Sequence, residues 1–254
     1  ENANAKLYYQ DQHISDLWIE EREYPITSDY NLHDKSHGFE SQFGSSFKNH
    51  FLTYGIDYSL TENKYFQDKY ENIFGYINRE DINGDNYPIK RSPDSETKRL
   101  GIYLQDEVNY GNFNIIGGIR IDKYKITPYP DSDYLEYCVP EENSQRVCNV
   151  ISLNIPPQIT PKIGITYPLN EELEIWGQYS RGFRSPTWSE LQATHINTDS
   201  KYQVLPNPDL KSEISNSYEI GLRGKYKKYN FELTGFFNNH INFIEESDPL
   251  KGPE

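Results

Sequence analysis

Residues 159–179 read Ile-Thr-Pro-Lys-Ile-Gly-Ile-Thr-Tyr-Pro-Leu-Asn-Glu-Glu-Leu-Glu-Ile-Trp-Gly-Gln-Tyr, with apolar side chains at alternate positions on both sides of a short turn. The alternating apolar residues are Ile159, Ile163, Ile165 and Tyr167, followed by Leu173, Ile175 and Tyr179. A period of two places these side chains on one face of a strand and the polar side chains on the other. Leu169-Asn170 between the two halves is turn-like. The stretch therefore predicts a β-hairpin with one apolar and one polar face.

The same alternation recurs along the chain and predicts an all-β protein. Further strands are expected over 52–60, 100–110, 113–121, 218–226 and 231–237, with weaker ones near 4–12 and 36–47. Short turns fall at 48–50, 110–112, 168–171 and 226–229, and long polar segments lie at 63–96, 128–156 and 184–211. Loops of that length are unusual in compact soluble domains. A transmembrane antiparallel β-barrel of the outer membrane, by contrast, has short turns at one end and long extracellular loops at the other.

We therefore predict that residues 1–254 are part of such a barrel, with the three long segments as extracellular loops. The count of about nine strands is odd, whereas single-chain bacterial barrels have even strand numbers. An open sheet edge would also leave backbone groups that lipid cannot satisfy. We expect a partial barrel, with its other strands and any plug domain lying outside this sequence.

Composition agrees with a barrel and argues against some partners. The chain has 22 Tyr, 12 Phe and a net charge of -14, and its mean hydropathy is -0.86. No stretch approaches the roughly 20 apolar residues of a membrane helix. A barrel strand needs only alternate apolar residues, which would contact membrane lipid, and Tyr favours the membrane interface. The negative charge argues against a nucleic-acid partner, because phosphate groups attract Lys and Arg.

The only two cysteines, Cys138 and Cys148, lie close together in a polar segment. A disulfide closing such a short loop would contribute roughly 2–3 kcal/mol and would require an oxidising compartment. We predict this disulfide; two free thiols are the alternative. A structural zinc ion is not expected, because no second Cys or His pair lies nearby.

A longer ordered set of motifs begins at Trp176. Residues 176–191 read Trp-Gly-Gln-Tyr-Ser-Arg-Gly-Phe-Arg-Ser-Pro-Thr-Trp-Ser-Glu-Leu, and residues 206–221 read Pro-Asn-Pro-Asp-Leu-Lys-Ser-Glu-Ile-Ser-Asn-Ser-Tyr-Glu-Ile-Gly. These stretches resemble the C-terminal half of the barrel in TonB-dependent outer-membrane receptors. Residues 101–107 and 117–124 are similar to the haem, haemoglobin and transferrin branch of that family. The resemblance covers about residues 97–245 and hardly extends to the first 95.

In haem receptors of that branch, one extracellular loop carries a Phe-Arg-Ala-Pro box, a histidine and an Asn-Pro-Asn-Leu box. Here the boxes read Phe183, Arg184, Ser185, Pro186 and Asn207, Pro208, Asp209, Leu210, with His195 between them. Ser185 and Asp209 depart from the pattern, and the second box also occurs in receptors for other substrates. The resemblance implies that His195 is a haem-iron ligand, because a neutral imidazole can bind haem iron. An ordinary exposed loop histidine is the alternative.

The resemblance implies uptake of haem, captured from haemoglobin or another haem-carrying protein, across the bacterial outer membrane. Haem would be the transported ligand and not a tightly bound cofactor. A TonB energy-coupling complex would act through the missing plug. No set of residues typical of a catalytic site stands out, so no enzyme activity is expected. The alternatives are a receptor of the same class for transferrin iron, a siderophore or zinc, a passive porin or barrel adhesin, and a secreted soluble β protein.

Overall fold

The computed structural model describes residues 1–21, 23–79, 87–138, 148, 150, 152–197 and 202–245, which contain twelve strands and two short helices. The long strands are β1 (Asn2–Glu20), β2 (Ile26–Phe47), β3 (His50–Ile73), β5 (Asp94–Tyr110), β6 (Phe113–Tyr129), β7 (Leu153–Pro168), β8 (Leu173–Arg184), β11 (Glu213–Tyr226) and β12 (Tyr229–Ile241). The short elements are β4 (Tyr76–Asn78), β9 (His195–Asn197), β10 (Tyr202–Val204), α1 (Ser132–Cys138) and α2 (Trp188–Gln192).

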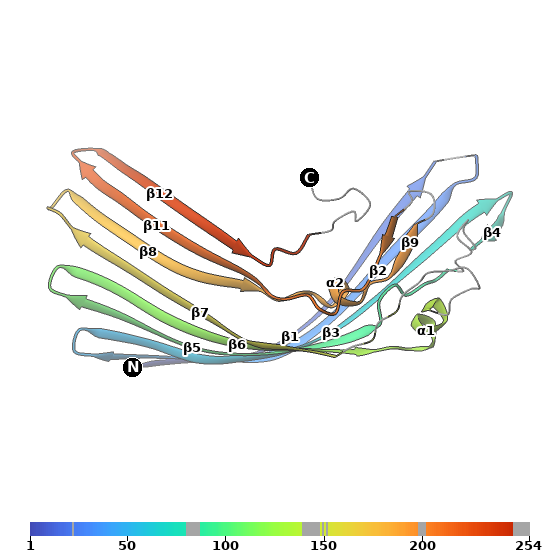
Figure 1. Cartoon of the computed structure of the whole chain (residues 1–254), viewed down its shortest axis with the longest axis horizontal. Coiled ribbons are helices and arrows are strands. Elements are labelled where there is room, and N and C mark those ends of the chain that lie inside the picture. Colours follow the sequence, from blue (N-terminus) through green and yellow to red (C-terminus); the bar gives the residue numbers. More distant parts are fainter. Residues whose placement is uncertain are drawn as a thin grey trace.

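The nine long strands form one antiparallel sheet in the order β1-β2-β3-β5-β6-β7-β8-β11-β12. Short β4 pairs only with β3, and β9 and β10 form a separate two-stranded sheet. Figure 1 shows the large sheet as one long curved layer. Strands β1 and β12 are its two edges, so the sheet is not closed. The predicted all-β antiparallel fold, with about nine strands of a partial barrel, is confirmed.

The connections at the two ends of the sheet differ in length. Two-residue turns join β2 to β3, β5 to β6, and β11 to β12, all at one end. Lys48, Gly111 and Lys227 in these turns have φ values of 55°, 60° and 55°, the left-handed conformation that tight hairpin turns require. The connections at the other end contain α1, α2, β9 and β10, as Figure 1 shows. At this same end, however, five residues join β1 to β2 and two residues join β3 to β4, so not every connection there is long.

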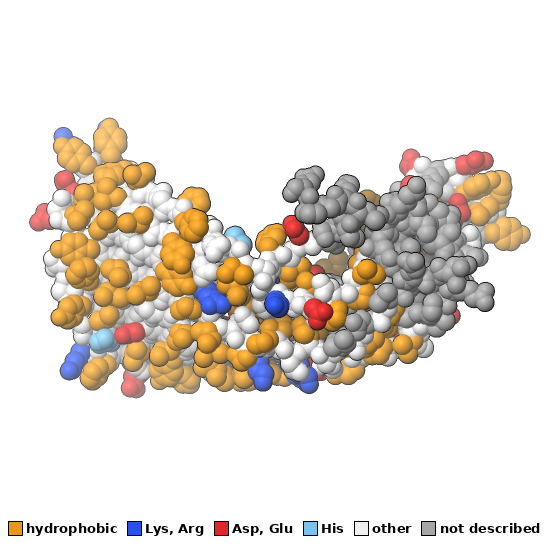
Figure 2. Space-filling view, viewed as in Figure 1, with side chains coloured by type: hydrophobic (Ala, Val, Ile, Leu, Met, Phe, Trp, Pro, Cys, Tyr) orange, Lys and Arg blue, Asp and Glu red, His pale blue; other side chains and the backbone are white. Residues whose placement is uncertain are grey.

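The cross-strand register separates an apolar face from a polar face. Ile102 pairs with Ile56 and Ile121, and Ile121 pairs with Ile159, so these four side chains form one row on the apolar face. The side chains of Ile102, Ile121 and Ile159 are exposed. In Figure 2, hydrophobic side chains are gathered over the end of the sheet that carries the short turns, with charged side chains mainly at the margins. A sheet with an exposed apolar face is what a membrane barrel requires.

The polar face carries charged side chains that bond to one another across β3, β5 and β6. Arg120 Nη1 lies 2.8 Å from Asp57 Oδ2, and Arg120 Nη2 lies 2.7 Å from Asp122 Oδ1. Arg99 lies 3.2 Å from the same two carboxylates. Gly101 makes room for this network, because a Cβ there would lie 2.0 Å from Arg120 Nη2. The network satisfies charges that would be costly to bury alone.

One predicted loop boundary is wrong. The segment expected to be a loop from residue 63 is a strand as far as Ile73, and β4 follows it after one turn. Strand β2 likewise starts at Ile26, ten residues before the weak strand expected from 36. The cause is the sequence pattern: beyond Glu62 both faces of β3 carry polar side chains, so hydrophobic alternation fades although the backbone ladder to β2 continues. Strands β2 and β3 therefore extend beyond the part of the sheet where apolar residues alternate with polar ones.

Most buried hydrophobic side chains lie where the long connections meet the sheet. The buried hydrophobic residues are Tyr87, Ile89, Ile126, Tyr134, Ile155 and Leu191. Ile126 belongs to β6 and Leu191 to α2, so the small core joins the sheet to the connections that cover it. No helix in the described part of the chain is long and apolar enough to span a membrane.

Candidate ligand-binding site

The connection between β8 and β11 folds back over the sheet and begins with the first predicted motif box. Pro186 is buried, and Ser185 Oγ donates a hydrogen bond to the Pro186 carbonyl oxygen at 3.1 Å. Thr187 then caps α2: the Glu190 N–H donates to Thr187 Oγ1, and Glu190 Oε2 accepts from the Thr187 N–H at 2.7 Å. This reciprocal capping box fixes the start of a helix that is too short to be stable alone.

Arg184, the last residue of β8, holds α2 against the start of β11. Its Nε donates to Glu213 Oε2 at 2.7 Å, and its Nη1 donates to Glu190 Oε2 at 3.0 Å. Partial burial would raise the pKa of Glu190, but hydrogen bonds from Arg184 and Thr187 outweigh it and lower that pKa below its usual range. The arginine of the box therefore positions the loop. Phe183 beside it packs edge-on against Tyr124 of β6, with ring centroids 5.7 Å apart.

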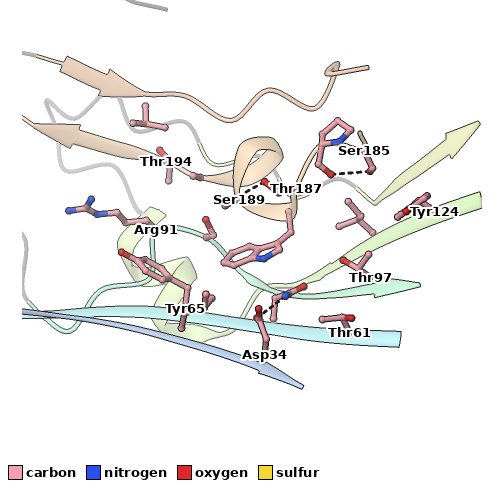
Figure 3. A pocket seen from close by; sticks show the side chains of 18 residues that line it. Asp34, Thr61, Tyr65, Arg91, Thr97, Tyr124, Ser185, Thr187, Ser189 and Thr194 are labelled. Carbon is pink, nitrogen blue, oxygen red and sulfur yellow. Dashed lines mark hydrogen bonds between the residues drawn. The ribbon is translucent and has the colours of Figure 1, made fainter. Parts of the chain in front are cut away.

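A cavity of about 710 Å³ lies between this loop and the polar face of the sheet. Its lining includes Leu32, Asp34, Asn63, Tyr65, Tyr124 and Ile126 from the sheet, and Arg91, Pro186, Trp188, Thr194 and Val204 from the connections. Figure 3 shows these groups around one open space, with Tyr65, Arg91 and Thr194 at one end and Tyr124 and Ser185 at the other. The volume falls within the range of small-molecule sites, which are typically about 300–1,000 Å³.

The backbone of His195 lies at the margin of this cavity. His195 follows Thr194, which lines the cavity, and begins β9 opposite Val204 of β10, which lines it too. The side chain of His195 lies outside the described part of the structure. Its role as an iron ligand therefore stays a prediction.

The second box has a different local role from the first. The Asp209 N–H donates to Asn207 Oδ1 at 3.2 Å, and the Leu210 N–H approaches the Asn207 carbonyl oxygen at 3.5 Å, so residues 207–210 form a turn. Pro208 lies within this turn. None of these four residues is among those that line the cavity. The box leads the chain from the loop back into β11.

The predicted disulfide falls partly outside the described residues. Cys138 ends α1, and its side chain is not described; Cys148 is half-buried. There is no free cysteine in the part of the chain that the structure describes. The pairing of Cys138 with Cys148 stays a prediction.

Several lining residues could not be found from the sequence. Arg91 lies in the connection between β4 and β5, and Tyr65 lies in the part of β3 that was expected to be a loop. Trp188 and Thr194 lie within the predicted motif loop, but no pattern marks them as lining a site. Only the folding of three distant segments onto one another brings these side chains together.

The described residues hold no group of three or more His, Cys, Asp and Glu side chains that could bind a metal ion. The cavity instead offers aromatic rings, hydroxyl groups, the Arg91 guanidinium and the Asp34 carboxylate. Such a lining suits an organic ligand with apolar surface and a few polar groups.

Comparison with known proteins finds a family profile that matches nearly the whole chain and relatives that match parts of it. The sequence profile described as "TonB dependent receptor-like, beta-barrel" matches residues 2–253. The chain is 30% identical over 136 residues to the haemoglobin-haptoglobin utilization protein B of Neisseria meningitidis serogroup C. That alignment covers 52% of this chain and 16% of the relative, so the chain spans a small part of the relative's length.

Two solved structures share the fold. Copper transporter OprC superposes with a TM-score of 0.67 at 13% identity, covering 95% of this chain and 36% of that one. The Serratia marcescens haemophore receptor HasR, solved with its haemophore HasA and haem, superposes with a TM-score of 0.57 at 17% identity, covering 96% and 37%. Likeness at this level of identity concerns the fold alone.

Proposed function

This chain belongs to the TonB-dependent receptor-like β-barrel family, and we propose that it is part of a receptor that takes up haem, captured from haemoglobin or another haem-carrying protein. The family consists of non-enzymatic receptors of the bacterial outer membrane, and that is the location of this chain. Energy for uptake would come from a TonB complex acting through a plug domain. Haem is the cargo in this proposal, not a resident cofactor.

The observation that carries the proposal is the cavity beneath the motif loop. It is large enough for a planar macrocycle, and Trp188, Tyr65 and Tyr124 give it aromatic walls. Aromatic side chains favour stacked or edge-on contact with other aromatic rings. The backbone of His195 lies at its margin through its pairing with Val204. The relative in Neisseria meningitidis, by its name a protein of haemoglobin-haptoglobin utilization, supports the same ligand class.

In the proposed uptake, the loop between β8 and β11 receives haem at the mouth of the barrel. A neutral His195 imidazole would bind the iron, since only an unprotonated ring nitrogen can do so. The second axial ligand would come from another part of the receptor. Arg184 and the capped α2 limit the motion of the loop, which lowers the entropy lost when the ligand binds.

The first prediction is that His195→Ala weakens haem binding about tenfold or more, equivalent to about 1.4 kcal/mol, and changes the haem absorption spectrum. The measurement is a haem titration of the full-length receptor in detergent, together with growth on haemoglobin as the iron source. Barrel assembly should stay normal, because β9 lies outside the large sheet.

His37→Ala is the matched control, because His37 is exposed and pairs with Leu60 of β3, away from the loop. An unchanged spectrum and unchanged growth in the His195 variant would make His195 an ordinary loop residue. If the wild-type receptor binds no haem but binds a ferric siderophore, transferrin or zinc, that ligand would replace haem as the proposed substrate. Passive diffusion without TonB would identify a porin.

A further inference from the structure

The apolar face of β6 ends at a lysine. From the short turn onward, the residues of β6 on this face are Phe113, Ile115, Gly117, Ile119 and Ile121, and none of them is charged. The nine residues from Phe113 to Ile121 match the roughly 9–11 residues that a strand needs to cross a membrane. The next two residues on the same face are Lys123 and Lys125. They therefore lie at the margin of the apolar face that is nearest the long connections.

Cross-strand pairing adds a third lysine at this margin. Lys98 of β5 lies directly opposite Lys125, and Leu100 lies opposite Lys123. Directly opposite side chains have Cβ atoms about 4.5–5.5 Å apart, and diagonal neighbours are about 7–8 Å apart. Lys123 and Lys125 are exposed, and neither forms an ion pair within the described structure. Like charges directly opposite each other destabilise a sheet, so the cluster needs an explanation beyond the two strands.

The nearest carboxylates on this face lie one step farther from the apolar residues. Glu96 Oε1 lies 2.7 Å from Lys98 Nζ, and Glu62 of β3 is the cross-strand partner of Glu96. The two rows that adjoin the apolar residues of β5 and β6 consist of Leu100 with Lys123 and of Lys98 with Lys125. These rows are positively charged in a chain whose net charge is -14. The charge pattern therefore suits an anionic group at the edge of the apolar face.

The place of the lysines in a barrel identifies the kind of anion. The long loops of outer-membrane barrels are extracellular, so this margin meets the outer leaflet, where lipopolysaccharide carries phosphate groups next to its acyl chains. Lysine side chains extend along apolar surface and keep the ammonium group at the interface. An ammonium group binds phosphate as a point charge, and anionic lipid headgroups attract clusters of basic residues beside a membrane span.

We propose that Lys98, Lys123 and Lys125 bind the phosphate groups of a lipopolysaccharide molecule, whose acyl chains lie against Leu100 and Ile121. The inference concerns the outer wall of the barrel and goes beyond haem uptake. It rests on the membership of the chain in an outer-membrane receptor family and on the register of β5 and β6.

The test uses the full-length receptor in detergent and three lipid probes: lipid A with its phosphate groups, the same lipid A after dephosphorylation, and phosphatidylglycerol. Binding is measured by native mass spectrometry and by the shift in thermal unfolding. We expect the wild-type receptor to bind phosphorylated lipid A about tenfold or more tightly than the dephosphorylated form. Neither phosphatidylglycerol at equal concentration nor inorganic phosphate should displace it.

The test variant combines Lys98→Gln, Lys123→Gln and Lys125→Gln. It should bind phosphorylated lipid A about tenfold or more weakly than the wild type, because each basic residue near an anionic lipid surface contributes about fivefold. Replacement of the same three residues by Arg should retain binding. In detergent without lipid, the Gln variant should be at least as stable as the wild type, since it removes facing like charges.

Two further variants serve as controls. Lys162→Gln removes the same charge on the polar face, where Lys162 lies opposite Gly118 of β6. Lys228→Gln removes it in the turn between β11 and β12, at the opposite margin of the sheet. Both variants should bind phosphorylated lipid A as the wild type does.

The outcomes are decisive in either direction. Equal binding of the two forms of lipid A by the wild type, or unchanged binding by the triple Gln variant, overturns the proposal. Displacement by phosphatidylglycerol would indicate general attraction of anionic lipids, and displacement by inorganic phosphate would indicate a site for free phosphate; either result overturns the assignment to lipopolysaccharide. Weaker binding in the triple Gln variant and in neither control supports it. None of these results depends on haem.

Discussion

Arg184 illustrates how a motif residue can hold a loop in place through contacts within the protein. The side chain bonds Glu213 at the start of β11 and Glu190 in α2, and it is 42% exposed. An exposed ion pair contributes little to global stability. Its effect is local, because the same guanidinium connects the strand that enters the loop, the helix within it and the strand that leaves it.

We predict that Arg184→Ala leaves the barrel folded but loosens the loop over residues 185–212. In limited proteolysis of the full-length receptor, this loop should be cut several-fold faster than in the wild type, because the free energy of local opening is lower. Arg184→Lys keeps the positive charge but cannot bond both glutamates through a planar guanidinium, so it should give an intermediate cleavage rate. Equal cleavage rates in the wild type and in both Arg184 variants would mean that the Arg184 guanidinium does not hold the loop.

The same contact has a defined pH dependence. The pKa of Glu190 is lowered in the folded state by its hydrogen bonds, against the opposing effect of burial. A lowered carboxylate pKa stabilises the fold above the unfolded-state pKa, and the stabilisation is lost as pH falls through the folded-state value. Protection of the wild-type loop should therefore stay constant from pH 7 to about pH 5 and fall only below about pH 4.5. Loss of protection near pH 6.5 would point to a histidine instead.

The cysteine pair gives a prediction that depends only on the sequence. Cys138 and Cys148 belong to a segment at the loop end of the sheet, outside the reducing cytoplasm for an outer-membrane protein. Thiol reagents should not label the folded, unreduced protein, and reduction should make both positions reactive. Stoichiometric labelling of both cysteines before reduction would disprove the pairing.

The strands carry the exposed apolar side chains of this fold. Ile220 of β11 is 60% exposed on the apolar face, and Glu219 next to it lies on the polar face. We therefore expect each strand to present one side to lipid and one to the barrel interior, as in known outer-membrane barrels.

We predict that Ile220→Arg destabilises the full-length barrel by about 2–4 kcal/mol and that Glu219→Arg costs about 1 kcal/mol or less. Urea unfolding in lipid vesicles measures both. Gly221 is unsuitable as the polar-face control, because a Cβ there would lie 2.4 Å from the Trp176 ring. Equal destabilisation by the two arginines would argue against a lipid-facing row at Ile220.

The whole molecule joins two regions with different packing. At one end, tight turns connect strands whose apolar side chains are exposed; at the other, long connections fold over the polar face and enclose the cavity. Figure 1 shows α2 and β9 above the strands at this second end. The cavity is thereby built on the sheet but completed by connections, and such a division allows one fold to serve different ligands.

The sequence alone determined the all-β fold, the four short turns and the position of the motif loop. These features have local causes. The alternation of apolar residues, the turn residues and the motif boxes each involve positions that are close together in the sequence. It failed at β3, where Tyr65 and the residues up to Ile73 continue the strand without a hydrophobic pattern. Backbone pairing with β2 maintains that strand, and pairing is not a property of one segment.

Only the tertiary structure decided the cavity. Arg91, Tyr65 and Thr194 come from three segments that are distant in sequence, and none belongs to a motif that marks a site. They meet because the loop after β8 folds onto the polar face of strands formed much earlier in the chain, where Arg184 and the α2 cap hold it. Local sequence sets the polarity and conformation of each segment, but which polar groups end up buried without partners depends on packing between segments.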